Sequence, residues 1–222
     1  MALRMSARPA RHVVVFVKAP RLGQVKSRLA TGIGALSALR FYRQTTACVL
    51  RRLGRNPRWR TLIAVTPPGA LHGGFWDASV PRLDQGAGDL GRRMARVFAT
   101  LPPGPAVIVG SDIPDLASRH VAAAFRALGR FDVVLGPAAD GGYWLIGLKR
   151  TWPIPAGLFE GVRWSSAHAL ADTRASLPRR FSVALLETLE DVDDGASYRR
   201  WRARDALRRR QRAFSDAPAG AA

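Results

Sequence analysis

The chain has 222 residues, of which 47% are hydrophobic and 23% charged, and its formal net charge is +19. This composition excludes a disordered chain, a collagen and a coiled coil, and the length suffices for one large domain. No apolar run approaches the roughly 18 residues of a membrane helix, and the single cysteine, Cys48, can form no internal disulfide. We therefore expect a soluble cytoplasmic protein with no membrane partner.

The excess of positive charge favours an anionic ligand without identifying it. Three of the 35 Lys and Arg residues are lysine, and the arginines are densest at residues 197–212. No helix-turn-helix, zinc-finger or RNA-binding strand signature accompanies the charge. Nucleic acid is therefore not the expected partner, although a basic nucleic-acid-binding protein stays open as the alternative from another class.

Short β-branched runs alternate with stretches of helical periodicity along most of the chain. The runs are typical of strands buried on both faces, and the stretches between them place apolar side chains on one helix face. This alternation predicts an α/β fold of three layers, in which helices cover both faces of a mostly parallel central sheet. Strands are expected at residues 12–17, 61–65, 106–110, 132–136 and 143–148, and helices around residues 39–53, 90–101 and 118–128. We expect Asp115 or Ser118 to cap the last of these helices.

The last third of the chain is less regular. Its expected elements are a helix at residues 166–176, a strand at 181–186 and an arginine-rich helix at 197–212. The acidic cluster Glu190, Asp191, Asp193 and Asp194 precedes that helix, where its dipole favours negative charge. We find no internal repeat or long linker. The expected organisation is a flexible N-terminus at 1–11, a single domain at 12–212 and a flexible tail at 213–222.

The loop after the first expected strand gathers positive charge. In open α/β sheets, ligands bind beyond the carboxyl ends of the strands, and this loop is a frequent site for phosphate. Gly23 allows a tight turn, and the cations around it are Lys18, Arg21, Lys26 and Arg28. A compact ammonium suits positions where a planar guanidinium does not fit. We interpret these five residues as a phosphate-binding set, with a solvated basic turn as the alternative.

A glycine-rich turn at residues 85–94 leads into the next expected helix. Its small residues let a flat ligand such as a nucleobase approach the backbone. Gln85 can read the edge of a base, and Asp89 can cap the helix or accept a hydrogen bond from a ribose or base. With Gly88 and Leu90 they form an expected nucleotide-binding turn, for which a plain capped turn is the alternative.

Two aspartates follow expected strands at the same edge of the sheet. Asp112 comes after a buried strand, and a carboxylate beside a diphosphate is a usual ligand of Mg²⁺ or Mn²⁺. Asp140 precedes Gly141 and Gly142 and could complete the metal site or activate an acceptor hydroxyl as a general base. We expect Asp112 to hold the metal and Asp140, together with Lys26, to be catalytic. A hairpin turn built on Asp-Gly-Gly is the alternative for the second segment.

Aromatic residues near these aspartates could contact the acceptor. Tyr143 begins the strand after the glycine pair, where its ring can stack on a sugar, and Trp164 lies in the later segment 160–166. We expect Gly141, Gly142, Tyr143 and Trp164 to line the acceptor or sugar side. Ser111 lacks a G-x-S-x-G elbow and the four histidines lack ligand spacing, so a hydrolase triad and a histidine metal site are not favoured.

Five motifs, in this order, resemble a bacterial family of glycosyltransferase-like proteins with a GT-A, nucleotide-diphospho-sugar transferase fold that is linked to arsenosugar synthesis. They are VVVFVKAPRLGQVKSRLA, QGAGDLGRRM, GSDIPDL, GPAADGGYWLIGL and LFEGVRWSS, followed by a late DVDD. The stretch KSRLA is also similar to phospholactate guanylyltransferases and, more distantly, to molybdenum-cofactor guanylyltransferases. Ser27 departs from the family pattern, which often has threonine there. The resemblance implies that Lys18, Lys26 and Arg28 contact phosphates, Gln85 and Asp89 the base, and Asp112 the metal.

These observations predict a metal-dependent glycosyltransferase that moves a sugar from a nucleotide-diphospho-sugar to a small acceptor, with Mg²⁺ or Mn²⁺ as cofactor. The alternative enzyme is a nucleotidyltransferase, which joins a nucleoside triphosphate to a phosphorylated small molecule and releases pyrophosphate. Both reactions require the basic loop and Asp112 to meet at one pyrophosphoryl group. The fold must therefore bring Lys26 close to Asp112.

Overall fold

The computed structural model describes residues 10–151 and 153–215. Most of the two expected flexible ends, residues 1–11 and 213–222, therefore lies outside the described residues. Among the helices that are described, none combines the length and the apolar character needed to cross a bilayer.

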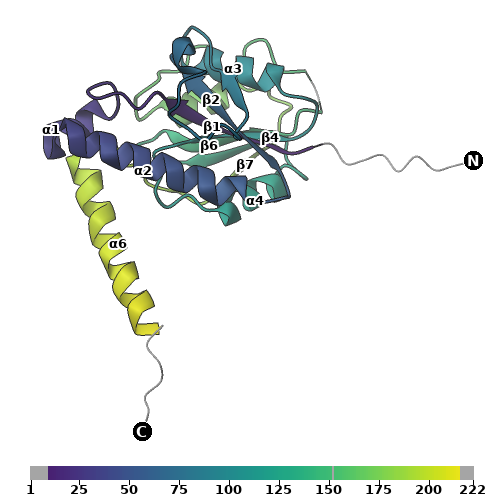
Figure 1. Ribbon diagram of the computed structural model, residues 1–222. Coiled ribbons are helices and arrows are strands. Elements are labelled where there is room, and N and C mark those ends of the chain that lie inside the picture. The colour runs from purple at the N-terminus through teal and green to yellow at the C-terminus, as the bar shows by residue number, and fades with distance from the viewer. Residues whose placement is uncertain (1–9, 152, 216–222) are drawn as a thin grey trace, which may run out of the picture.

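A seven-stranded sheet runs through the middle of the molecule, in the order β3-β2-β1-β4-β6-β5-β7 (Figure 1). Neighbouring strands are parallel except around β6, which is antiparallel to both β4 and β5. This arrangement confirms the predicted α/β fold with a mostly parallel sheet. The strands are β1 (His12–Lys18), β2 (Arg60–Thr66), β3 (Arg82–Asp84), β4 (Ala106–Gly110), β5 (Val133–Pro137), β6 (Tyr143–Leu148) and β7 (Val183–Leu185).

Helices cover both faces of this sheet, so the three predicted layers are present. The helices are α1 (Ser27–Ile33), α2 (Ala35–Gly54), α3 (Leu90–Thr100), α4 (Ser118–Ala127), α5 (Ala169–Ala175) and α6 (Gly195–Ser215), with a short 3₁₀ helix, η1 (Pro68–Ala70). The sequence pattern did not predict α1, η1 or β3. Short elements of this kind depend on tertiary packing more than on local propensity, which explains why they were missed.

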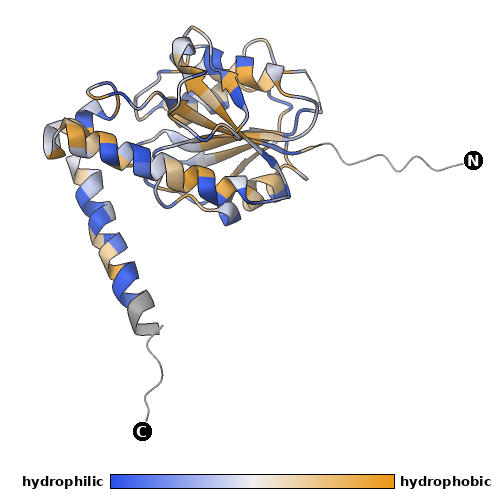
Figure 2. Cartoon of the chain, viewed as in Figure 1, coloured by the Kyte–Doolittle hydropathy of each residue, from blue (hydrophilic) through white to orange (hydrophobic). Residues whose placement is uncertain are grey.

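Two hydrophobic clusters hold the layers together. Val13 and Val15 of β1 belong to the cluster that contains side chains of α2 and α4, whereas Val14 belongs to the cluster that contains side chains of α3 and α5. Successive side chains of a strand point to opposite faces, so one β-branched run contributes to both clusters. Figure 2 shows the central strands mostly in orange, as expected for strands buried on both sides.

The N-terminal caps of α3 and α4 can be compared with those expected from the sequence. Asp89 caps α3, which is one of the two roles considered for it, because its Oδ1 accepts a hydrogen bond of 2.8 Å from the backbone nitrogen of Arg92. The expectation for α4 is wrong: Ala117 is the N-cap, and Ser118 is the first helical residue. The Ser118 hydroxyl instead donates to the backbone carbonyl of Arg52, 2.7 Å away. The Ser118 side chain therefore bonds to a residue 66 positions away in the sequence and does not cap the start of its own helix.

The acidic residues near α6 also divide between local and distant partners. Asp194 Oδ1 accepts a 2.7 Å hydrogen bond from the backbone nitrogen of Ser197, so part of the acidic cluster caps α6 as expected. Glu190 pairs with Arg200 and Arg204 of the same helix. Asp115 does not cap α4. Its carboxylate pairs with Arg208 instead, which joins the loop after β4 to α6.

The centre of the sheet is tightly packed around Gly147 of β6. A Cβ there would lie 2.7 Å from Val107 Cγ1 and 2.6 Å from Val134 Cγ1, on the two neighbouring strands. Overpacking of a core costs about 1 to 3 kcal/mol, so Gly147→Ala should lower the free energy of unfolding by about that amount. Urea denaturation measures it.

The matched control is Gly54→Ala at the end of α2, where an added Cβ has no neighbour within 4 Å. This variant should be as stable as the parent or slightly more stable. Equal stability of the two alanine variants would contradict the packing argument.

Candidate functional site

The basic loop and the end of β4 meet at the carboxyl edge of the sheet. Lys26 Nζ lies 2.7 Å from Asp112 Oδ2 and 3.3 Å from Asp193 Oδ1. The Lys26 side chain is 5% exposed, whereas those of Asp112 and Asp193 are 32% and 44% exposed. Because β1 and β4 are parallel neighbours, their carboxyl ends lie at the same edge, and this closes a separation of 86 residues. The ammonium is covered by protein, and the two carboxylates remain open to solvent.

Lys26 is held in an uncommon backbone conformation at the start of α1. Its φ of 52° and ψ of 46° lie in the left-handed region, which a residue with a side chain adopts only where its surroundings favour it. The Lys26 carbonyl accepts the hydrogen bond from Ala30 that begins the helix, and its ammonium pairs with Asp112. Burial by itself would lower the pKa of Lys26, but Asp112, Asp193 and Asp191 outweigh it and raise that pKa. Lys26 is therefore a permanent cation at neutral pH.

Asp191 and Asp193 belong to this site, although the sequence analysis placed them in a cluster at the start of α6. Asp193 Oδ2 also accepts from Arg28 Nη1 at 3.3 Å, so it links the last acidic segment to two cations of the basic loop. Burial and the negative charges of Asp112 and Asp140 raise the pKa of Asp191 to about 6. The sequence contains a signal for this division. Asp194 lies three residues before Ser197, which is a helix-capping spacing, whereas Asp191 and Asp193 occupy alternate positions, as residues on one face of an extended segment do.

Asp140 lies in the turn between β5 and β6, which pair as an antiparallel hairpin. Its Oδ1 accepts a 2.9 Å hydrogen bond from the backbone nitrogen of Gly142, so the hairpin alternative describes the local structure correctly. Gly141 has a φ of 86°, and a Cβ there would lie 2.3 Å from the Ala167 carbonyl oxygen. The turn is therefore pressed against the segment that follows Trp164. The backbone nitrogen of Ala139 donates to the Leu189 carbonyl at 3.2 Å, which places the hairpin turn beside the segment that carries Asp191.

Gln85 is buried and has a structural role. Its Nε2 donates to the backbone carbonyls of Val17, at 3.1 Å, and Ala64, at 2.8 Å, and so ties β1 to β2. Arg93 Nη1 donates to Gln85 Oε1 at 3.4 Å. Both ends of the amide are thus engaged within the protein, and the contact between Gln85 and a base stays a prediction. Arg93, which the sequence analysis did not single out, lines the cavity next to it.

A cavity of about 440 Å³ collects many of the predicted residues. Those that line it are Lys18, Lys26, Arg28, Gln85, Leu90 and Asp112, joined by Asp193 and Arg93. The predicted residues Arg21, Gly23, Gly88 and Asp89 do not line this cavity, since they occupy the exposed parts of the two flanking loops. Cations and carboxylates thus share one hollow at the carboxyl edge, where α/β folds bind ligands.

The expected acceptor residues form a separate aromatic group. The rings of Tyr143 and Trp164 meet edge to face with centroids 6.4 Å apart, and Phe159 packs against Trp164. Burial raises the pKa of Tyr143, and its hydroxyl accepts a hydrogen bond from Thr173. Gly91 of α3 allows this close packing, because a Cβ there would lie 2.8 Å from Trp164 Cζ2. None of these residues lines the 440 Å³ cavity.

The carboxylates offer oxygen ligands of the kind that hard divalent cations prefer. Across residues 10–151 and 153–215, no three His, Cys, Asp or Glu side chains converge as a ready-made metal cage. Mg²⁺ usually takes one or two protein carboxylates and completes its shell with water and substrate phosphates. Asp112 and Asp193, both partly exposed, fit that pattern. The donor set therefore suits a divalent cation that binds together with a phosphorylated ligand.

Comparison with known proteins identifies the family. The model of a family of uncharacterized proteins conserved in bacteria, DUF2064, matches residues 49–166, and the chain belongs to this family. A search of curated proteins found no match.

Solved structures share the fold over nearly the whole chain. A candidate nucleotide-diphospho-sugar transferase from Desulfovibrio desulfuricans G20 is 28% identical, with a TM-score of 0.76 over 90% of this chain and 97% of that one. Rv0371c from Mycobacterium tuberculosis H37Rv, in complex with manganese, is 17% identical, with a TM-score of 0.53 over 87% and 98% of the two chains. CMP:2-keto-3-deoxy-manno-octonic acid synthetase, in complex with CTP, is 10% identical, with a TM-score of 0.56 over 90% and 99%. The last two show likeness of fold alone.

A double-mutant cycle tests whether the ion pair organises the site. Substitutions of two residues in direct contact have coupling energies of about 0.5 to 3 kcal/mol. The burial of Lys26 favours a coupling energy in the upper part of that range, and the exposure of Asp112 to solvent lowers it. The cycle uses Lys26→Met, Asp112→Asn and the double variant, with unfolding followed in urea.

The matched control pair is Arg209 and Asp205, which form an exposed i,i+4 ion pair on α6. Such pairs contribute only about 0.3 to 0.5 kcal/mol. A coupling energy between Lys26 and Asp112 no larger than that of the control pair would show that the contact does not organise the site.

Proposed function

We propose that this member of the DUF2064 family is a metal-dependent transferase that moves a sugar from a nucleotide-diphospho-sugar to a small acceptor. The observation that carries the proposal is the 2.7 Å contact between Lys26 Nζ and Asp112 Oδ2, which sets a cation and a carboxylate side by side in a cavity of about 440 Å³. The D. desulfuricans protein, 28% identical over 90% of this chain, supports the choice of substrate class.

The cations of the cavity would bind the diphosphate of the donor. Lys18, Lys26, Arg28 and Arg93 line one hollow, and Lys26 is already oriented by its carboxylate partners. When the bond between the sugar and the diphosphate breaks, negative charge grows on the leaving phosphate oxygens. Charge-assisted contacts contribute about 1.5 to 3 kcal/mol each. They accelerate the reaction only to the extent that they strengthen in the transition state, and groups fixed in advance reorganise least.

Asp112 is the proposed ligand of Mg²⁺ or Mn²⁺, with Asp193 as a second carboxylate. A bound cation of this kind supplies positive charge that stabilises the leaving diphosphate. The manganese complex of M. tuberculosis Rv0371c, which shares the fold, is in keeping with this choice of cofactor.

The acidic side of the site would serve the acceptor. Asp140 is the proposed group that orients or deprotonates the acceptor hydroxyl. Asp191 is a second candidate for this role, because burial and the neighbouring carboxylates raise its pKa to about 6, where it can take up a proton near neutral pH. The hairpin glycines Gly141 and Gly142, with the Tyr143 and Trp164 rings behind them, are the proposed acceptor side.

A second reaction uses the same residues. In nucleotidyl transfer, a phosphorylated substrate attacks the α-phosphorus of a nucleoside triphosphate, the bond to the β-phosphate breaks, and pyrophosphate leaves. Lys26 and Arg28 would then bind the departing pyrophosphate. The likeness of fold to a synthetase solved with CTP favours keeping this candidate.

Asp112→Asn tests the proposed metal ligand. Loss of one group that stabilises a transition state typically lowers turnover by about 100-fold or more, and we expect a loss of that size. Mn²⁺ binding, measured by calorimetry in the presence of a nucleoside diphosphate, should weaken in parallel. Circular dichroism should show an unchanged fold.

Asp205→Asn, which removes the same charge from the surface of α6, should leave turnover and Mn²⁺ binding as in the parent. Full activity of Asp112→Asn would contradict the proposed role of this residue.

The products separate the two reactions. With Mn²⁺, an acceptor mixture and a panel of sugar nucleotides, chromatography should detect a nucleoside diphosphate whose release depends on the acceptor. With nucleoside triphosphates and phosphorylated acceptors, a coupled pyrophosphatase assay should detect no pyrophosphate. Release of pyrophosphate without nucleoside diphosphate would show nucleotidyl transfer and contradict glycosyl transfer. The absence of both products would contradict both reactions.

A further inference from the structure

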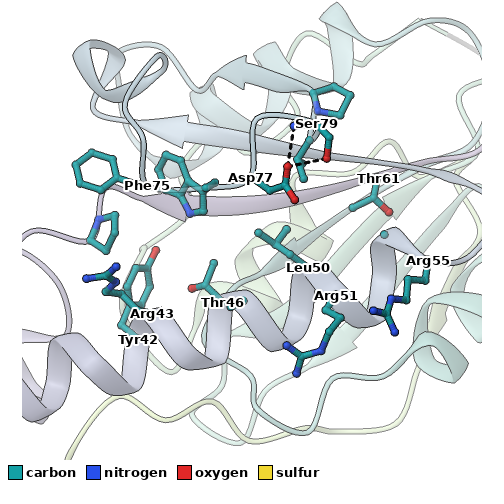
Figure 3. Close-up of a pocket in the computed structure, with 16 residues that line it drawn as sticks. Tyr42, Arg43, Thr46, Leu50, Arg51, Arg55, Thr61, Phe75, Asp77 and Ser79 are labelled. Carbon is teal, nitrogen blue, oxygen red and sulfur yellow. Dashed lines mark hydrogen bonds between the residues drawn. The ribbon is translucent and has the colours of Figure 1, made fainter.

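A second cavity, larger than the candidate site, lies on the other side of Tyr42. Its volume is about 660 Å³, and one of its walls is α2. The opposite wall is the segment 67–81 between β2 and β3, as Figure 3 shows. Pockets of this size are typical of small-molecule binding sites. The residues predicted from the sequence to bind phosphate, base or metal do not line it.

Arginines of α2 give this cavity a positive rim. Arg43 and Arg51 of α2, and Arg55 directly after the helix, follow one another at intervals of eight and four residues, and all three line the cavity (Figure 3). Arg51 Nη2 donates a hydrogen bond of 3.1 Å to Cys48 Sγ. In the part of the chain that the structure describes, none of the three forms a salt bridge. Asp77 is the acidic residue in the lining. Its Oδ1 accepts from the backbone nitrogen and hydroxyl of Ser79, at 2.9 and 2.8 Å, so it is engaged in its own turn.

The opposite wall is aromatic and is held in place without a ligand. The rings of Phe75 and Trp76 meet edge to face with centroids 5.7 Å apart, across the cavity from Leu50. The Arg82 guanidinium anchors this wall, because it donates to the backbone carbonyls of Leu71, Gly73 and Trp76 at 3.0 to 3.1 Å. A wall fixed in advance spares a ligand the entropic cost of ordering it.

Tyr42 separates the two cavities and lines both. Its hydroxyl accepts from the backbone nitrogen of Lys18 at 2.8 Å and donates to the Lys18 carbonyl at 2.9 Å. These bonds fix the buried ring at the end of β1. A ligand in the larger cavity would therefore lie against Tyr42 and would not contact Asp112.

We propose that the larger cavity is a second binding site, for a small molecule that joins a flat apolar ring to a carboxylate or phosphate. The ring would pack against Phe75 and Trp76, and the anionic group would bind Arg51 and Arg55, since a guanidinium that forms no salt bridge is suited to planar or tetrahedral oxyanions. The net charge of +19 favours an anion here as elsewhere, but the aromatic wall limits the ligand to one with an apolar part. The inference does not depend on the reaction at Asp112.

The probe is 1-naphthyl phosphate, titrated into the full chain by isothermal calorimetry at fixed ionic strength. We expect saturable binding of one molecule per chain. Removing two charge-assisted contacts with Arg51→Gln/Arg55→Gln should weaken it by about tenfold or more. The matched control is Arg126→Gln/Arg130→Gln, which removes the same charge from exposed residues that do not line either cavity. Equal weakening by both double variants, or no binding to the parent, would overturn the proposal.

Two further variants locate the bound probe. Ala47→Trp adds bulk to an exposed position of α2 in the lining, without a change of charge, and should abolish binding. Arg28→Gln should leave the affinity for the probe unchanged, because this cation lines the candidate site and does not line the larger cavity. Retained binding in the first variant, or lost binding in the second, would place the probe elsewhere. 1-Naphthalenemethanol, which lacks the anion, should bind at least about tenfold more weakly, and equal affinity would refute the role of the arginines.

Discussion

A buried ammonium between two carboxylates holds the site together. Lys26 comes from the start of α1, Asp112 from the end of β4 and Asp193 from the segment before α6, so one side chain joins three distant parts of the chain. A covered charge without a partner would be costly, and removal of either carboxylate would leave the ammonium poorly compensated. The left-handed backbone at Lys26 and the position of the late acidic segment across the carboxyl edge of the sheet are both consistent with this constraint.

The sheet topology decides which groups can act together. The parallel strands β1 and β4 end side by side and bring the basic loop to Asp112, whereas β6 runs antiparallel and returns the chain through the Asp140 hairpin. Cations and carboxylates therefore alternate around the cavity, and the Asp140 hairpin lies beside it. In the proposed reaction, the cations of this cavity bind the donor diphosphate, and the hairpin that leads into the reversed strand carries the group proposed to act on the acceptor hydroxyl.

Tyr42 gives the molecule two adjoining cavities of different character. On one side of its ring lie the cations and carboxylates of the candidate site, and on the other lie the arginines in and directly after α2 and the Phe75–Trp76 wall. Because the Tyr42 hydroxyl is bonded to the backbone of Lys18, a ligand on either side meets the same fixed ring. The two cavities are thus neighbours that share the Tyr42 side chain. The variants proposed for each cavity change residues that do not line the other.

The sequence by itself determined the α/β fold, the long strands and helices, and the loops that meet at the carboxyl edge, because hydrophobic periodicity and glycine-rich turns are local properties. It also indicated that Lys26 and Asp112 must meet. Only the tertiary structure decided the partners of Gln85, Ser118 and Asp115, the place of Asp191 and Asp193 in the site, and the existence of the larger cavity. Those features depend on groups many residues apart, and a polar side chain that could bond locally turns instead to the partner that packing brings within reach.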